Sequence, residues 1–429
     1  MNDNFKRVLL ISNVPVTPYS AQGASRGSWF RKWDRESLAM MSFAKADKSD
    51  DFANHLFTVG LNEKFGGGVL KKILKQDSSL VQDKEVLIKP IKLNKKENTK
   101  SFRKKIKVLL GLFTYPKYSN DLKKFIKNFK PDIIFSTVAD CYGARLAKFL
   151  SKKANIPYII QQEDNWLVTD VFKGLLAKFV YKKRKSCLKS TLKNASKRYV
   201  ICPSMKDHFE SLFNLEFESL FCADDMKRFL KPVNHNPKNM TIFTYIGNSQ
   251  PGRSPEFIKI AQAIKNVKII NPEFLIYSTN AYESDVKKLE EFGFVKFLDM
   301  PHHDDVPLVL SESNVLILTE SFDEDIIEYT KLALSSKVQI YMMTKIPILI
   351  FASPKTGVMD YALKTKFAYA VTEDNIDKLE QAVKSITNNK TIREDIVNKA
   401  LKVAKTNHDA DIIRLDLKNT ITDICDKGR

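Results

Sequence analysis

The chain has 429 residues, of which 43% are hydrophobic and 28% are charged; these values are typical of a folded protein with more than one domain. No apolar run reaches the roughly 20 residues that a membrane-spanning helix needs. The apolar start of the chain lacks a small-residue cleavage site and predicts a first strand, not a signal peptide. The five cysteines are scattered without metal-binding spacing, which argues against disulfides and zinc and predicts a reducing compartment.

The positive charge is confined to the first half of the chain. Residues 1–230 contain 44 Lys and Arg against 23 Asp and Glu, whereas residues 231–429 contain 26 against 27. This asymmetry predicts an anionic partner for the first half only, either an anionic membrane surface or nucleic acid. No nucleic-acid motif accompanies the basic residues, which favours the membrane surface.

Short apolar runs alternate with helical patterns along the first half. Strands are expected at 7–13, 131–136, 157–161 and 199–203, and basic helices at 104–113, 121–131 and 172–198. The alternation predicts a parallel sheet with helices on both faces. We interpret residues 14–27 as a loop, 30–38 as a helix and 62–100 as a mobile lobe. The helices at 104–113 and 121–131 could lie on a membrane, or could be solvated faces over an apolar core.

The second half repeats this alternation after a polar segment with two prolines. We expect an N-terminal Rossmann-like domain over 1–225, a linker over 226–239, a C-terminal Rossmann-like domain over 240–405 and a final helix over 406–429. The fold class is therefore α/β. Ligands of such domains bind beyond the carboxyl ends of the strands.

The stretch at 334–352, LSSKVQIYMMTKIPILIFA, is the most informative part of the second half. Ser335 and Ser336 are typical of a helix N-cap, and Lys337 follows in the first turn. A helix start with an adjacent lysine can hold a phosphate group. The alternative is an ordinary helix–strand unit with a surface lysine.

These motifs resemble those of the retaining nucleotide-sugar glycosyltransferases of family four, which have the GT-B fold of two Rossmann-like domains facing across a cleft. The resemblance lies in the segment 245–248 (YIGN) with Gly252-Arg253, and in the run from Ser336-Lys337 to Pro347-Ile348. The first half is similar to members that build bacterial surface polysaccharides, through LLISNVP, SWF and QQEDNW. In this fold the final helix could cross back to the first domain.

The resemblance implies a role for individual residues. Residues on the donor diphosphate would be Gly23, Gly247, Arg253, Ser336 and Lys337. Glu320, at the end of the strand VLILT, would lie near the transferred sugar. Independently of the resemblance, Asp164 or its neighbour Glu163 could position or deprotonate an acceptor hydroxyl; the alternative for Asp164 is a helix N-cap.

The sequence departs from the family pattern at Ile340, where the family carries a glutamate that binds the ribose. Gln339 or Glu328 could substitute for it. The resulting hypothesis is a retaining, metal-independent glycosyltransferase without a cofactor, which uses a nucleotide-diphosphate sugar and a lipid-linked or glycan acceptor. It would work in surface-glycan synthesis in the cytoplasm, peripherally on the inner face of the membrane. The alternative is a non-catalytic GT-B-like scaffold subunit.

Overall fold

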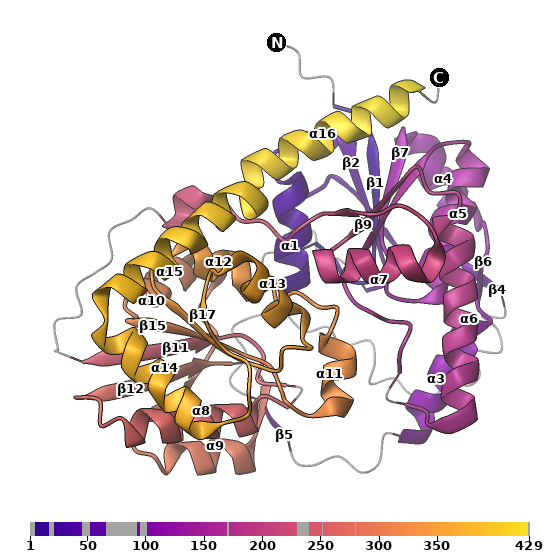
Figure 1. The fold of residues 1–429 in the computed structure, drawn as a ribbon. Helices are drawn as coiled ribbons and strands as arrows, with labels where there is room; N and C mark the ends of the chain where they lie inside the picture. The colour runs from indigo at the N-terminus through magenta and orange to yellow at the C-terminus, as the bar shows by residue number, and fades with distance from the viewer. Residues whose placement is uncertain are drawn as a thin grey trace. The chain divides into compact units, whose positions relative to one another are not determined.

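The computed structural model describes residues 5–16, 21–44, 52–65, 92–94, 101–169, 171–229, 240–250, 252–278 and 280–427 (Figure 1). The chain divides into two units. Unit 1 comprises Met1–Glu85, Asn98–Phe221 and Asp411–Arg429, and unit 2 comprises Val86–Glu97 and Cys222–Ala410. Most of the predicted lobe at 62–100 and residues 230–239 of the predicted linker lie outside the described residues.

Unit 1 is built on a seven-stranded sheet in the order β10-β9-β8-β7-β1-β2-β3, in which all pairs are parallel. The strands are β1 (Val8–Ser12), β2 (Leu38–Ser42), β3 (His55–Thr58), β7 (Ile133–Thr137), β8 (Tyr158–Gln162), β9 (Lys197–Val200) and β10 (Glu218–Ser219). Strands β1, β2, β7 and β8 are buried at every residue. This is why they appear in the sequence as continuous apolar runs.

The helices of unit 1 lie between these strands in the chain. They are α1 (Ala21–Phe30), α3 (Ser101–Leu112), α4 (Asn120–Phe129), α5 (Cys141–Ala154), α6 (Gly174–Leu192) and α7 (Pro203–Phe213), and the last helix of the chain, α16 (Ala410–Lys427), also belongs here from Asp411 onward. Helix α4 buries Leu122, Ile126 and Phe129, so its lysines form a solvated face over a core. None of the described helices combines the length and apolarity of a membrane span.

The expectation for residues 14–38 is wrong. Helix α1 occupies part of the predicted loop and ends at Phe30, and in place of the predicted helix at 30–38 a turn and a short 3-10 helix (Arg35–Ser37) lead into β2. The reason is tertiary, because Trp29 and Phe30 are almost fully buried at the end of α1. The indole nitrogen of Trp29 also donates to the carbonyl of Phe221 at 2.9 Å.

Unit 2 is built on a six-stranded parallel sheet in the order β14-β12-β11-β15-β16-β17. The strands are β11 (Thr241–Ile246), β12 (Pro272–Tyr277), β14 (Val295–Leu298), β15 (Val315–Thr319), β16 (Ile348–Phe351) and β17 (Tyr369–Val371). The helices are α8 (Ser254–Asn266), α9 (Glu283–Glu290), α10 (Val306–Ser311), α11 (Glu324–Thr330), α12 (Lys337–Met343), α13 (Gly357–Thr365), α14 (Ile376–Asn388) and α15 (Lys390–Val403).

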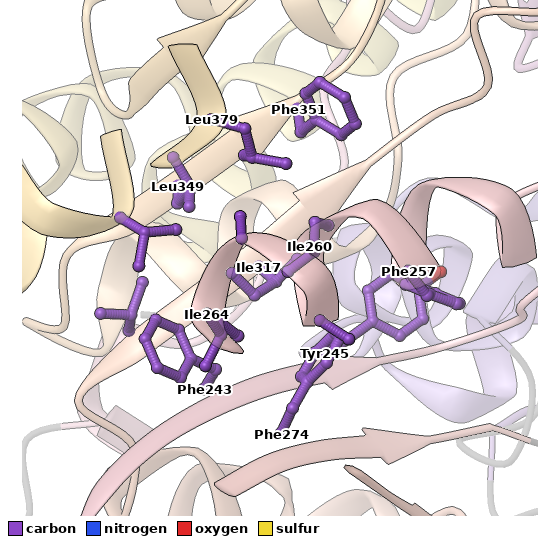
Figure 2. Packing of buried hydrophobic residues seen from close by; sticks show 14 of the residues in the cluster. Phe243, Tyr245, Phe257, Ile260, Ile264, Phe274, Ile317, Leu349, Phe351 and Leu379 are labelled. Atoms are coloured by element: carbon purple, nitrogen blue, oxygen red, sulfur yellow. The ribbon is translucent and has the colours of Figure 1, made fainter. Parts of the chain in front are cut away.

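The core of unit 2 packs aromatic and branched side chains between the sheet and its helices (Figure 2). Tyr245 of β11 contacts Phe257 of α8 edge-on, with ring centroids 4.7 Å apart. Phe274 of the neighbouring strand β12 packs against the same Phe257 ring, 6.1 Å away. This packing holds the start of α8 over the end of β11, where the candidate site begins.

One predicted domain limit needs correction, whereas the final helix joins the first unit as expected. A short strand, β5 (Lys92–Asn94), pairs with β13 (Asn280–Tyr282), so it belongs to unit 2 and not to the domain predicted over 1–225. The final helix is part of unit 1. Arg414 of α16 donates to the carbonyl of Ser28 at 2.7 Å, and Asp426 pairs with Lys6 at 2.6 Å.

The two ends of unit 2 are joined around a buried histidine. The amide of Asp224 donates to the carbonyl of His408, and the amide of Ala410 donates back to Asp224. The ring of His408 is fully buried, with Nδ1 2.8 Å from the carbonyl of Cys222 and Nε2 3.0 Å from the hydroxyl of Tyr361. Because a carbonyl only accepts, Nδ1 carries the proton and Nε2 accepts from Tyr361.

We predict that acid destabilises unit 2 through His408. Burial lowers its pKa to about 4, while the hydrogen bond to Cys222 opposes the shift. The unfolded chain titrates near ~6.5 and binds the extra proton first, so stability is lost as the pH falls from ~6.5 through ~4. The loss at pH ~4 should be about 3 kcal/mol. Urea unfolding across this range should show a shallower pH slope in His408→Gln. The exposed control His302→Gln should keep the wild-type slope, and an unchanged slope in His408→Gln would contradict the assignment.

Candidate functional site

The centre of the candidate site is a buried ion pair at the carboxyl ends of two neighbouring strands. Arg253 stands immediately before α8, in the connection that follows β11, and Glu320 immediately follows β15. Strands β11 and β15 pair in parallel, so both residues come to the same edge of the sheet. Nη2 of Arg253 lies 2.7 and 2.6 Å from the two carboxylate oxygens of Glu320, and both residues are buried.

The remaining donors of Arg253 bind main-chain carbonyls. Nε donates to Thr319 at 3.2 Å, and Nη1 donates to Gln250 at 2.6 Å and to Asn248 at 3.3 Å. Burial alone would lower the pKa of Arg253, but the adjacent carboxylate of Glu320 outweighs it and raises that pKa. Arg253 therefore holds the loop after β11 against the end of β15, with its guanidinium already satisfied by protein groups.

Gly247, at the end of β11, allows a side chain to cross the backbone. Its φ is +132°, and a Cβ at this position would lie 2.9 Å from both Cδ and Nζ of Lys337. Any other residue would be strained and would push the lysine away. Gly247 does permit a close approach to its backbone, and the group that approaches is the side chain of Lys337 in the same unit.

Lys337 directs its ammonium group to this edge of the sheet. It is the first residue of α12, and Nζ lies 4.9 Å from the centroid of the Tyr245 ring. Within the described residues the ammonium has no hydrogen-bond or ion-pair partner. The residue keeps a partly exposed surface, while its ammonium lies among protein atoms. Burial and the repulsion from Arg253 lower the pKa of Lys337 to about 7, opposed by Glu320.

A helix starts after Ser336 as predicted, but the predicted serine cap is not formed by its side chain. Ser336 occupies the N-cap position, but its side chain caps no amide. The hydroxyl of Ser335 accepts instead from the amide of Lys337, at a long 3.4 Å. Helix α12 is seven residues long, so few aligned peptide dipoles act at its start. An anion at this position would depend mainly on the ammonium of Lys337.

Helix α12 also contains Ile340, the position where the family pattern has a glutamate. Ile340 is partly buried. Gln339 is buried, and its Oε1 has no hydrogen-bond partner in the described part of the chain. Glu328, the other candidate substitute, pairs with Lys331 at 2.7 Å. The unsatisfied amide oxygen of Gln339 is costly in a protein interior.

Unit 1 contains a second buried ion pair that sequence reasoning missed. Arg26 of α1 binds Glu163 through Nε at 3.1 Å and Nη2 at 2.6 Å, and Nη1 donates to the hydroxyl of Ser12 at 2.5 Å. The predicted Gly23 lies in the same helix. The available signal was an arginine beside a glycine soon after the first strand of each unit, as in SRG (25–27) and GRS (252–254).

Asp164 follows the carboxyl end of β8, next to Glu163. Its residue surface is exposed, yet partial burial of the carboxyl group and the neighbouring Glu163 raise the pKa of Asp164, opposed by Arg26. Four side-chain atoms near this edge are buried without a partner among the described residues: Asn13 Oδ1, Ser136 Oγ, Gln161 Oε1 and Asn165 Oδ1. Such atoms are candidates for binding water or a polar ligand.

Comparisons with known proteins bear on the fold alone. No protein-family model matches the chain, and no curated protein matches it. Among solved structures, sucrose-phosphate synthase from Thermosynechococcus elongatus superposes with a TM-score of 0.65 at 12% identity, covering 98% of this chain and 100% of that chain.

Two further structures match over nearly the whole chain with somewhat lower TM-scores. HepE of Anabaena, in complex with UDP and glucose, gives a TM-score of 0.59 at 11% identity and covers 97% of this chain and 99% of its own. WaaG, a glycosyltransferase involved in lipopolysaccharide biosynthesis, gives 0.58 at 11% identity, with 97% and 99% covered. The similarity spans both units, each with a parallel sheet. The chain therefore has the GT-B glycosyltransferase fold.

Proposed function

We propose that this protein is a glycosyltransferase that uses a nucleotide-diphosphate sugar, with the diphosphate bound in unit 2 beside Lys337. The observation that carries the proposal is the ammonium of Lys337, without a hydrogen-bond or ion-pair partner in the described residues, above Gly247 at the carboxyl edge of the sheet. This is the edge where doubly wound sheets bind ligands. The similar HepE structure contains UDP, a nucleoside diphosphate of the kind that a cation at this edge would bind.

In the proposed reaction an acceptor oxygen bonds to the anomeric carbon of the donor sugar, and the bond from that carbon to the diphosphate breaks. Negative charge grows on the leaving diphosphate, where the cation of Lys337 would stabilise it. This role requires no metal and no cofactor. Both oxygens of Glu320 bind Arg253, but each keeps a second lone pair for a sugar hydroxyl. Asp164 would orient the acceptor hydroxyl and take up the proton that its oxygen loses as the new bond forms.

The finer parts of the proposal concern the acceptor and its location. We infer a retaining transfer to a lipid-linked or glycan acceptor in surface-glycan synthesis, at the cytoplasmic face of a membrane. The support is the resemblance of the motifs in both halves and the excess of 44 basic over 23 acidic residues in positions 1–230, which an anionic membrane would attract.

A second candidate is a non-catalytic subunit with the same fold. Ile340 favours it, because a hydrophobic side chain occupies the position where the family binds ribose. Incubation with a panel of nucleotide sugars separates the two candidates: release of the nucleoside diphosphate, with or without an acceptor, supports the enzyme. Donor binding with no turnover under any condition supports the scaffold.

The first prediction concerns donor affinity. Lys337→Ala should weaken binding of a nucleotide sugar by about 10- to 100-fold, the range expected for loss of a charged hydrogen bond. Isothermal titration calorimetry on the folded variant measures it. Lys355→Ala, which removes an exposed ion pair with Glu324 in the same unit, should bind as the wild type does. Equal affinities for Lys337→Ala and Lys355→Ala would refute the site.

The second prediction is a pH dependence of the same affinity. A nucleotide sugar keeps the charge of its diphosphate diester between pH ~6 and ~9, so any slope comes from the protein. Because the pKa of Lys337 is about 7 and only its protonated form attracts the diphosphate, affinity should be constant below that pH. Above it, affinity should fall by up to about tenfold per pH unit. Lys337→Arg should abolish the slope, since arginine stays charged.

The third prediction separates the architecture of the site from its chemistry. Arg253→Met should lower the free energy of unfolding by about 3–5 kcal/mol, because it leaves the carboxylate of Glu320 buried without its partner. Arg253→Met with Glu320→Leu should recover much of that loss in urea unfolding. The double variant should still lack transferase activity, because the loop after β11 is no longer held and the carboxylate proposed to contact the sugar is absent. Full activity in the double variant would show that the ion pair has no functional role.

A further inference from the structure

Unit 1 exposes a continuous group of large hydrophobic side chains outside the candidate site. Its members, here called the α6–β6 patch, are Phe65, Phe113, Tyr115, Leu175, Leu176 and Phe179, with exposed fractions of 59, 55, 51, 83, 42 and 39%. The other exposed large hydrophobic residues among those described lie singly or in pairs on separate elements. A clustered set of this kind indicates a contact surface.

One cross-strand pair and one lysine that contacts two aromatic rings connect most elements of the patch. Phe65 of β4 (Lys64–Phe65) is the cross-strand partner of Tyr115 of β6 (Tyr115–Pro116). Nζ of Lys183, on α6, lies 5.9 Å from the ring centroid of Phe113 and 5.8 Å from that of Phe179. Helices α3 and α6 pack against each other and against α5, and Figure 1 shows α3, α6, β4 and β6 together on one side of unit 1.

The hydrophobic side chains are held outward by ordered structure. From Leu112 to Tyr115 burial alternates, with Leu112 and Thr114 buried and Phe113 and Tyr115 exposed. Arg145 of α5 fixes this segment by donating to the carbonyls of Leu112 and Thr114 at 2.8 and 2.7 Å.

Helix α6 is apolar on two sides at its N-terminal end. Val180 is fully buried on the inner side, whereas Leu175 and Phe179, one turn apart, occupy the outer side, where a helix at a protein surface is normally polar. Leu176, one turn before Val180, lies at the border between the two sides and is also exposed.

The surroundings of the patch are strongly basic. Residues 171–206 contain no Asp or Glu, and neither do residues 98–120. Lys178, Lys182 and Lys183 of α6 are exposed. Leucine and phenylalanine on one face, flanked by lysines, are typical of helices that lie in the interface of an anionic bilayer. The alkyl stems of the lysines can lie along the apolar surface while their ammonium groups reach lipid phosphates.

We propose that the α6–β6 patch docks unit 1 onto the surface of an anionic membrane, with Leu175, Leu176 and Phe179 inserted at the headgroup level. A protein partner fits less well, because lysine is depleted at the cores of protein interfaces. Nucleic acid also fits less well, because the aliphatic Leu175 and Leu176 cannot stack on bases. Docking would give access to a lipid-linked acceptor, and this purpose rests on the proposed function. Docking itself needs neither donor nor acceptor.

A fluorescent label placed in the patch tests insertion directly. All five native cysteines are buried, so Leu175→Cys in the full chain can be labelled selectively with a polarity-sensitive dye. Vesicles containing phosphatidylglycerol should shift its emission to the blue, whereas phosphatidylcholine vesicles should not. The matched control is Ile270→Cys, at an exposed residue of unit 2 (74%), whose label should stay unchanged. An unchanged label at position 175 overturns the proposal.

Vesicle sedimentation then separates insertion from charge attraction. Leu175→Gln with Phe179→Gln should weaken partitioning onto phosphatidylglycerol vesicles by about tenfold or more, and so should changing Lys178, Lys182 and Lys183 to Gln. The apolar control is Ile270→Gln with Leu308→Gln, and the charge control changes the exposed Lys287, Lys288 and Lys384 to Gln. Both controls should bind as the wild type does, and unfolding midpoints verify that every variant is folded.

Three outcomes would overturn the patch as a docking surface. Binding that the lysine variants abolish but the Leu175/Phe179 variant retains would mean attraction by charge alone. Equal losses in the control variants would mean that the site is elsewhere. Tighter binding to duplex DNA than to vesicles, lost with the same lysines, would mean a nucleic-acid surface. Because no donor or acceptor is present, these results do not depend on whether the protein transfers a sugar.

Discussion

The ion pair between Arg253 and Glu320 is the constraint on which the candidate site of unit 2 depends. Two ions taken out of water are tolerated only when their attraction and hydrogen bonds compensate for the lost hydration. Here Nη2 of the guanidinium contacts both oxygens of the carboxylate, and Nε and Nη1 donate to the carbonyls of Thr319 and Gln250. The loop after β11 is thereby fixed to the end of β15, with Gly247 below the side chain of Lys337.

This arrangement gives the two cations of the site different tasks. Arginine has five donors in a planar fork and remains charged when buried, which suits a structural clamp. Lysine carries a compact charge whose pKa responds to its surroundings, and Lys337, beside the buried Arg253, has a pKa of about 7. A cation that is only partly ionised at neutral pH gains its full charge when an anion binds, so the clamp also tunes the residue proposed to meet the diphosphate.

Unit 1 uses the same construction with different residues. Arg26 binds Glu163 and Ser12, and so connects the helix after the first strand to the ends of β1 and β8. The nearby Asp164 and several unsatisfied polar atoms make this edge a polar surface. The opposite chemistry, hydrophobic side chains among lysines, is concentrated on the α6–β6 patch. Unit 1 therefore separates a polar edge from an amphipathic surface, the one proposed to dock on a membrane.

The sequence by itself determined the α/β class, because strands buried on both faces appear as mainly apolar runs such as VLLI in β1 and VLIL in β15. The helix start at 334–352 pointed to Lys337, and the resemblance of the motifs to a known family implied Gly247, Arg253 and Glu320; the structure brings all four to one sheet edge. It failed for α1, because the burial of Trp29 and Phe30 depends on distant parts of the chain.

Only the tertiary structure decided which charges are paired. Arg253 and Glu320 are 67 residues apart in the chain, and Arg26 and Glu163 are 137 apart. No local pattern predicts such a pair, since the partner of a buried charge is selected by sheet order. That order places the ends of β11 and β15 side by side, which pairs Arg253 with protein groups and leaves the ammonium of Lys337 without a hydrogen-bond or ion-pair partner among the described residues.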